Sequence, residues 1–163
     1  MTNPALDTPT DLQSNQVQSV AQALNQALAD AYALYLKTKN FHWHVSGPHF
    51  RDYHLLLDDQ ATEILAVTDL IAERVRKLGE TTLRSIGDIA RRQQVKDNDA
   101  DFVPPREMLL ELRDDNLRLV QQFREVKDLA DAAKDNATSG IVDDWTDQAE
   151  QRAWFLFEAT RGA

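Results

Sequence analysis

Cysteine is absent from the 163-residue chain. Disulfides and thiolate metal sites are therefore excluded. Any metal that this protein holds must be bound by imidazole and carboxylate groups, which suit iron, zinc or manganese.

Glycine and proline are scarce, with five of each in the chain. Four of the prolines fall outside the stretches in which apolar residues recur periodically. Sparse turn residues favour a few long helices over many short strands. The length suits one domain, and an apolar fraction of 42% is sufficient for a folded core.

Long hydrophobic runs are also missing. The longest uncharged stretch, residues 12–29, contains seven Gln or Asn and two Ser, which is too polar for a membrane span. The N-terminal residues have neither the basic nor the apolar segment of a secretory signal. These features predict a soluble, cytoplasmic protein that does not bind membranes.

Basic residues are absent from the first 36 positions, and the formal net charge is −9. Binding of a polyanion requires clustered Lys and Arg, so the bulk surface is unsuited to nucleic acid. The same charge favours the attraction of cations.

Apolar residues recur at spacings of three and four over most of the chain, which predicts an all-α protein. We expect a four-helix bundle with a short extra helix between the second and third helices. The bundle domain is assigned to residues 11–161, preceded by a flexible tail at residues 1–10. We expect three long helices at about residues 12–39, 49–78 and 104–133 and a fourth long helix that ends near residue 160. The short extra helix is expected at residues 85–93.

All four histidines lie between positions 42 and 54. His54 and Asp58 are four residues apart, as are Asp69 and Glu73, so each pair shares one face of the second helix. With His54 at zero on a helical wheel, the other three fall at roughly 40°, 60° and 100°. Because this side also carries apolar residues such as Leu65, we expect the polar groups to be partly buried and to need a cation as a partner.

The rise of the helix separates the two pairs. Asp58 and Asp69 are eleven residues apart, roughly 16 Å along the axis, so one metal cannot reach both on a straight helix. Either there are two weak sites, or a second chain supplies the missing half. A two-fold dimer with antiparallel second helices would place His54 and Asp58 against Asp69 and Glu73 of its mate, giving two equivalent sites. His42 precedes the turn at residues 45–48 and can fold back to join them.

Simpler interpretations apply to the parts of this set. A single carboxylate pair at this spacing is usually a solvated helix face, and Trp43 is as readily a packing aromatic. His44 and His49 are interpreted as turn or surface residues. Mixed nitrogen and oxygen ligation with few protein ligands leaves open positions for Fe(II) and an oxidant, whereas a structural zinc site requires four tight ligands.

The run FHWHVSGPHFRDYHLLLD at residues 41–58, followed by TDLIAERVRKLG at 68–79, closely resembles the Dps family, the DNA-protection-during-starvation proteins or miniferritins. The pattern extends from Leu24 to Glu158 and includes WFLFEA in the last helix. The chain lacks the Glu-x-x-His motif of classical ferritins, which favours the miniferritin.

The resemblance implies a ferritin-like subunit of a hollow dodecamer that oxidises Fe(II), preferably with hydrogen peroxide, and stores the ferric mineral. His42, His54 and Asp58 are the implied ligands from one subunit, and Asp69 and Glu73 those from its neighbour. Zinc is a potential competitor for the iron. Trp43 is a candidate acceptor of stray oxidising equivalents. Acidic residues early in the last helix are candidates for an ion-entry pore, or favourable charge near a helix N-terminus: Asp143, Asp144 and Asp147.

The family name suggests DNA binding, but the Lys-rich tail that DNA-binding members often use is missing here. We therefore predict weak or no binding of DNA near neutral pH. Two competing hypotheses remain, a nucleoid-associated protein that compacts DNA directly and an interaction protein with a structural zinc. Basic residues are interpreted as charged faces paired with Glu73, Glu80 and Asp88: Arg74, Arg76, Lys77, Arg84, Arg91 and Arg92.

Overall fold

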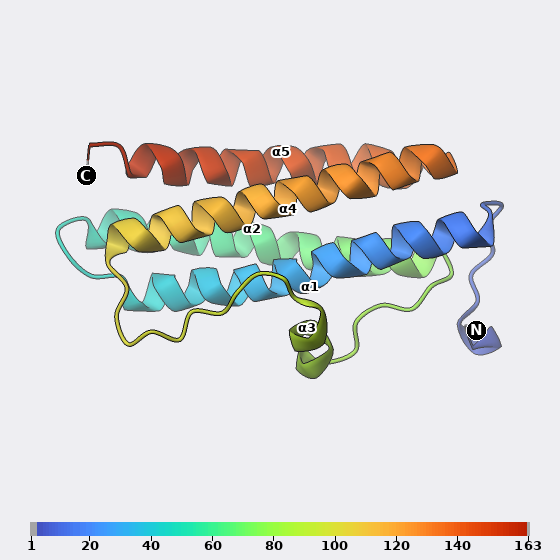
Figure 1. Cartoon of the computed structure of the whole chain (residues 1–163), viewed down its shortest axis with the longest axis horizontal. Helices are drawn as coiled ribbons and strands as arrows, with labels where there is room; N and C mark the ends of the chain where they lie inside the picture. Colours follow the sequence, from blue (N-terminus) through green and yellow to red (C-terminus); the bar gives the residue numbers. More distant parts are fainter. Residues whose placement is uncertain (1–2, 163) are drawn as a thin grey trace.

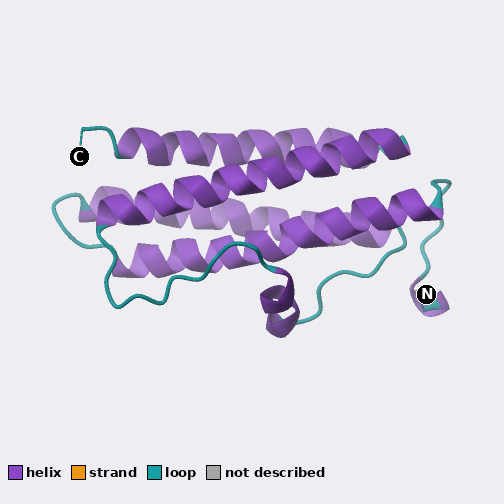
Figure 2. Cartoon of the chain, in the orientation of Figure 1, coloured by secondary structure: helices purple, strands orange, loops and turns teal. Residues whose placement is uncertain are grey.

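The computed structural model describes residues 3–162, which contain helices and no strand (Figure 2). The all-α prediction is thereby confirmed. The elements are a short 3₁₀ turn, four long helices and a short helix between the second and third of these. Their bounds are Pro4–Leu6 for η1, Ser14–His44 for α1, Phe50–Lys77 for α2, Ile86–Arg92 for α3, Pro105–Ala133 for α4 and Asn136–Ala159 for α5.

The four long helices form two antiparallel hairpins, α1 with α2 and α4 with α5 (Figure 1). A long connection that includes α3 runs along α1 and links the hairpins (Figure 1). The core between them is apolar and aromatic, with Leu24, Leu57, Phe123 and Trp145 almost fully buried. No helix within residues 3–162 combines the length and hydropathy that crossing a bilayer requires.

Two helix boundaries differ from the prediction. α1 continues to His44 rather than ending near residue 39, because Phe41 and His42 are buried and prolong the packed face. α5 begins at Asn136, directly after α4, so the expected break at 135–138 is far shorter. The Asp135 carboxylate caps α5 by accepting from the Thr138 amide at 3.1 Å.

The N-terminal segment lies against the end of α2. Arg76 Nη2 donates to the Leu6 carbonyl at 2.6 Å. Gly79 has a φ of +86°, and a Cβ there would lie 3.1 Å from the Thr8 carbonyl oxygen, so glycine suits this turn. The flexibility expected of residues 1–10 stays a prediction, and Met1 and Thr2 lie outside the described residues.

A buried carboxylate ties the α3–α4 connection to α1. Oδ1 of Asp30 accepts from the backbone amides of Gln94 at 2.6 Å and Val95 at 2.7 Å. Oδ2 accepts from the side-chain amides of Gln26 at 3.1 Å and Gln122 at 2.5 Å. Four donors surround the carboxylate, which satisfies a charged group that is fully removed from solvent.

We predict that Asp30→Ala lowers the free energy of unfolding by about 3 kcal/mol, because buried amides lose a charged acceptor. Urea unfolding measures the loss, and hydrogen exchange should accelerate at the Gln94 and Val95 amides. Asp99→Ala is the control, since Asp99 lies exposed on the same connection. Unchanged exchange at both amides in the Asp30 variant would contradict this anchoring role.

Candidate metal centre

His42 at the end of α1 and His54 in the first turns of α2 stack on each other. Their ring centroids are 3.8 Å apart and the planes differ by 18°. Nδ1 of His42 lies 2.7 Å from the carbonyl oxygen of His54, and Nδ1 of His54 lies 2.8 Å from that of His42. The α1–α2 hairpin therefore brings together the two histidines that the sequence predicted would meet.

These reciprocal hydrogen bonds fix the tautomer of both rings. A carbonyl oxygen can only accept, so each Nδ1 must carry the proton. In the neutral ring the lone pair then belongs to Nε2. Both Nε2 atoms are left as metal-binding nitrogens, oriented by backbone acceptors as metal-binding imidazoles commonly are.

Asp58 lies beside the stacked rings, one turn after His54. Its Oδ1 is 3.9 Å from Nε2 of His42 and 2.7 Å from Nζ of Lys39. The hydrogen bond from Lys39 holds the pKa of the Asp58 carboxyl below its ordinary value, against an opposing contribution from desolvation. The carboxylate therefore stays ionised, but its present partner is an ammonium group that a metal would have to displace.

Asp69 and Glu73 do not join this group within one chain. Both are exposed further along α2, and Oε2 of Glu73 is 3.7 Å from Nζ of Lys77. Among residues 3–162, no three His, Asp or Glu side chains of one chain converge on a common metal position. A single copy thus presents three of the predicted ligands at one end of α2 and two at the other.

The middle of the bundle is not an alternative metal site. The guanidinium of Arg152, which is 2% exposed, lies there, with its Nε donating to Asn116 Oδ1 at 2.8 Å. Its Nη1 is 3.5 Å from Oε2 of Glu63. Burial lowers the pKa of Arg152, and Glu63 opposes that shift. The positively charged guanidinium of Arg152 at the centre of the bundle therefore repels a metal ion.

The face of α2 that carries the ligands is apolar and open. We expected the polar groups on this side to be partly buried, and His54 and Asp58 are half-buried. Asp69 and Glu73 are exposed in the single chain, and Leu65 between the two pairs is 42% exposed. Leu55 and Leu70 on the same helix are exposed as well. Large apolar side chains that project beside potential ligands indicate a surface that another molecule covers.

Comparison with known proteins places this architecture in a family. The model of the ferritin-like domain matches residues 21–161. The chain is 33% identical to the DNA protection during starvation protein of Agrobacterium fabrum, over 91% of this chain and 92% of that protein. It is 31% identical to DNA protection during starvation protein 1 of Deinococcus radiodurans, over 94% and 74%.

The chain belongs to the DNA-protection-during-starvation (Dps) family of ferritin-like proteins. Its fold matches the crystal structure of a Dps protein from Vibrio cholerae, with a TM-score of 0.90 and 26% identity over 98% of this chain and all of that one. The ferritin-like fold class is thereby confirmed.

The remaining candidate residues of this Dps subunit lie apart from the histidine pair or at its edge. Trp43 is 57% exposed at the edge. Asp143, Asp144 and Asp147 are exposed near the start of α5. Asp143 Oδ1 lies 3.1 Å from Lys127 Nζ. The redox role of Trp43 and the pore role of the acidic group stay predictions.

Our reading of the sequence missed Lys39. Lys39 precedes His42 by three residues, and in a helix this spacing places both side chains on one face. The sequence therefore contained a sign of their proximity, but we expected the helix to end near residue 39 and did not compare the two positions. Nζ of Lys39 also lies 5.8 Å from the Trp43 ring centroid, where an ammonium group can be stabilised by the indole.

We predict that Lys39→Met raises the pKa of Asp58 toward the ordinary carboxyl value, because the hydrogen-bonded cation is removed. Carbon NMR titration of the carboxyl group measures this shift.

The Lys39→Met change should also tighten Co(II) binding by about three- to tenfold, since no ammonium competes for the carboxylate. Lys96→Met, at an exposed position on the connection, is the control. Weaker Co(II) binding in the Lys39 variant would contradict the competition.

Proposed function

We propose that two copies of the chain pair about a two-fold axis and oxidise Fe(II) at two equivalent sites between them. In each site His42, His54 and Asp58 of one copy face Asp69 and Glu73 of the other. The observation that carries this proposal is the incomplete half-site, in which two oriented Nε2 atoms and one carboxylate lie together. The other two carboxylates lie roughly 16 Å along α2, where an antiparallel mate brings them opposite.

The similar proteins support the proposal of iron oxidation. Three proteins that are 31–33% identical to the chain carry the name DNA protection during starvation protein. The Vibrio cholerae Dps structure is described as a member of a broad superfamily of ferritin-like diiron-carboxylate proteins. Iron oxidation and storage, rather than a closed structural zinc site, is therefore the function that we assign.

Each group has a defined part in handling Fe(II) as the substrate. The neutral Nε2 atoms bind the ferrous ion, and the anionic carboxylates stabilise Fe(III) more than Fe(II), which favours loss of an electron. Hydrogen peroxide, the preferred oxidant, takes one electron from each of two ferrous ions and yields two hydroxide ions. Lys39 leaves Asp58 when iron enters, and Trp43 beside it can lose an electron to a stray oxidant.

The ferric product is then stored as a mineral inside a hollow dodecamer. Exposed carboxylates at the start of α5, Asp143, Asp144 and Asp147, suit an entry path for cations. Removal of both Fe(II) and peroxide suppresses the formation of hydroxyl radicals and so protects DNA. Zinc competes with iron, because imidazole and carboxylate bind both. The cytoplasm is the proposed location.

Direct compaction of DNA is the alternative function, and side-chain pairing disfavours it. Arg74 binds Asp135 at 2.9 Å rather than the expected Glu73. Arg76 donates to two backbone carbonyls. Asp88 pairs with Arg91 at 3.3 Å, as the sequence predicted. Most of the basic residues are therefore engaged within the chain.

We predict no retention of duplex DNA in a mobility-shift assay at low salt and pH 7, because the negative net charge and the engaged guanidinium groups leave few phosphate contacts. Tight binding that weakens steeply with added salt would instead support the nucleoid-associated alternative.

Complementation tests the shared site. We predict that His54→Ala and Asp69→Ala each abolish rapid oxidation of Fe(II) by peroxide, since each removes a ligand from both sites of a homodimer. Coexpression of the two variants should restore about a quarter of the sites, because each mixed dimer contains one intact site. Stopped-flow absorbance of the ferric product measures the rates.

The matched control pairs His54→Ala with His42→Ala. Both changes lie on the same half of the site, so every mixed dimer remains defective and coexpression should restore nothing. Equal recovery in the two mixtures, or a wild-type rate in the His42→Ala, Asp69→Ala double variant, would rule out the assigned ligands. The second result would favour the structural-zinc hypothesis.

A further inference from the structure

The ring of Phe50 lies over the face of His54 that His42 leaves open. Phe50 is the first residue of α2 and precedes His54 by four residues, so the two side chains lie on one side of the helix. Their ring centroids are 5.0 Å apart and the planes differ by 30°. His42 is also nearly parallel to the imidazole of His54, at 3.8 Å. Two rings side by side on one face would clash at such distances, so His42 and Phe50 occupy opposite faces of His54.

A stack on both faces fixes a property of the ring that its hydrogen bond leaves free. The bond from Nδ1 of His54 to the carbonyl oxygen of His42 sets one direction within the plane of the ring. A metal binds along the Nε2 lone pair, which lies in the same plane, so the tilt of the plane decides where the metal is bound. Neighbours on both faces limit this tilt, and they leave the ring edge that carries Nε2 free.

His54 needs this support more than His42 does. His42 is 7% exposed, so close packing holds its ring, whereas His54 is only half-buried. Phe50 is 45% exposed and lies outside the buried core that contains Phe41 and Phe123. The contact with His54 therefore explains the aromatic ring at this position better than the stability of the bundle does.

The turn between α1 and α2 sets the position of Phe50. Its backbone amide donates to the carbonyl of Gly47 at 3.0 Å. Gly47 has a φ of +117°, a conformation that residues with a Cβ rarely adopt. In the same part of α2 the hydroxyl of Tyr53 donates to the carbonyl of Ala159 at 3.2 Å, which ties the start of α2 to the end of α5. The backbone that carries Phe50 and His54 is thus held independently of the Phe50 ring.

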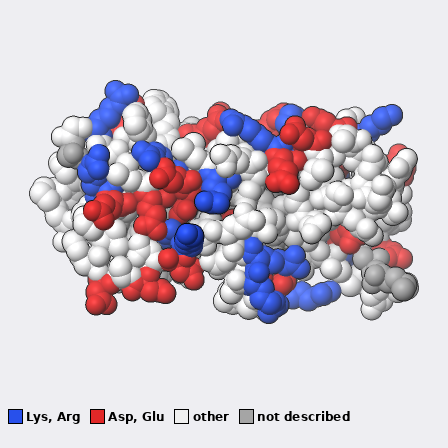
Figure 3. All heavy atoms as spheres, viewed as in Figure 1, with Lys and Arg blue, Asp and Glu red and all other residues white. Residues whose placement is uncertain are grey.

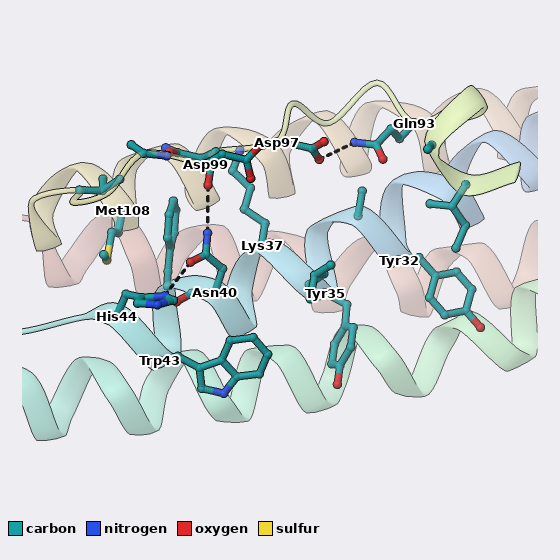
Figure 4. Close-up of a pocket in the computed structure, with 18 of the residues that line it drawn as sticks. Tyr32, Tyr35, Lys37, Asn40, Trp43, His44, Gln93, Asp97, Asp99 and Met108 are labelled. Atoms are coloured by element: carbon teal, nitrogen blue, oxygen red, sulfur yellow. Dashed lines mark hydrogen bonds between the residues drawn. The ribbon is translucent and has the colours of Figure 1, made fainter. Parts of the chain in front are cut away.

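Other side chains at the end of α1 have different neighbours. Nδ1 of His44 lies 2.8 Å from the side-chain oxygen of Asn40, one turn earlier on the same helix. Figure 4 shows Asn40 and His44 joined in this way, with Trp43 on the neighbouring side of α1. His44 is therefore engaged within its own helix, and the second ring over His54 comes from α2.

The ring over His54 is also neutral, which favours binding of a cation beside it. An arginine can stack on an imidazole as an aromatic ring does, but its charge would repel the metal ion. A group of basic side chains gathers instead over α3 (Figure 3). α3 is fastened to α1 at Gln26, which donates to the Arg92 carbonyl, roughly 24 Å along the helix from His42. Phenylalanine thus holds the imidazole plane without adding positive charge.

We propose that Phe50 is a positioning residue that holds the imidazole plane of His54 for binding of the ferrous ion. The proposal rests on the assignment of His54 as an iron ligand in the proposed function, and it extends the site to a residue that cannot itself bind metal. A ring that is already held loses less freedom when iron binds, so Phe50 strengthens binding. Once iron is bound, the metal holds the ring, and Phe50 has little effect on the oxidation itself.

Steady-state kinetics separate binding of Fe(II) from its oxidation. Phe50→Leu keeps an apolar side chain but removes the ring, and it should raise the KM for Fe(II) by about three- to tenfold, which corresponds to the strength of one aromatic pair. The kcat with peroxide should stay within about twofold of the wild-type value, because the lost positioning affects the ground state and the transition state alike. Phe50→Tyr keeps the ring and should restore the wild-type KM.

Phe155→Leu is the matched control for the loss of an exposed ring. Phe155 is 42% exposed on α5 and packs edge-on against Trp154 rather than on a histidine. Its KM should equal that of the wild type, and circular dichroism should show equal helix content in all variants. An unchanged KM in Phe50→Leu, or a loss confined to kcat, would overturn the positioning role.

A second readout uses the metal-free protein at a single pH. Proton NMR with isotopically labelled histidine detects the Nδ1–H groups, and His42→Ala and His54→Ala assign the two signals. In Phe50→Leu the Nδ1–H of His54 should exchange with water at least about threefold faster, whereas that of the buried His42 should change less. Equal acceleration of both signals would indicate a loosened hairpin and overturn the specific role, as would no change in either.

The two readouts distinguish failure of this inference from failure of the proposed function. If Phe50→Leu accelerates exchange at His54 while His54→Ala oxidises Fe(II) at the wild-type rate, the stack orders the ring but the iron assignment fails. If His54→Ala abolishes oxidation and Phe50→Leu matches the wild type in both KM and exchange, the iron site stands and the positioning role fails.

Discussion

The paired hydrogen bonds between the His42 and His54 rings and each other's backbone carbonyls are the constraint on which the site depends. They join the last turn of α1 to the first turns of α2 across the hairpin, and they assign the proton of each ring to Nδ1. The same two bonds therefore serve the fold and the chemistry. Without them the rings could rotate, and neither the direction nor the protonation of the metal-binding nitrogens would be fixed.

The sequence predicted the parts of this arrangement that follow from local geometry. A turn at residues 45–48 returns the chain, so His42 and His54 had to approach, and helical rise alone separates Asp58 from Asp69. The sequence did not predict Arg74 with Asp135, whose partners are far apart in the chain and meet through the packing of α2 and α5. Nor could a helical wheel reveal that Leu65 is exposed, because a wheel gives the direction of a side chain and not what covers it.

The proposed division of the site between two chains would couple metal binding to association. In a single copy Asp58 already has a cation, Lys39, and the two imidazoles with one carboxylate offer few ligands. In the proposed pair, a second copy would add the carboxylates of Asp69 and Glu73, of which only Glu73 has a cation nearby, Lys77 at 3.7 Å, so the balance would shift from ammonium toward metal. Any ligand that binds better to the pair than to the single chain also favours the pair, by reciprocal linkage. In the proposed pair, binding of iron and binding of the second copy would therefore strengthen each other.

The interior of the bundle is filled by the chain's own side chains and, among the described residues, contains no candidate metal ligands in common with the proposed site. Helices that enclose a structural metal lose their core when it leaves, since the ligands then remain buried and unpaired. Here the centre is filled by Arg152 with Asn116 and by a closely packed aromatic core around Phe123 and Trp145. The proposed iron ligands lie instead at an edge of the bundle, where Asp58 is partly exposed and Asp69 and Glu73 are exposed. A subunit whose fold does not depend on its metal can release oxidised iron and take up the next ferrous ion, as a storage protein must.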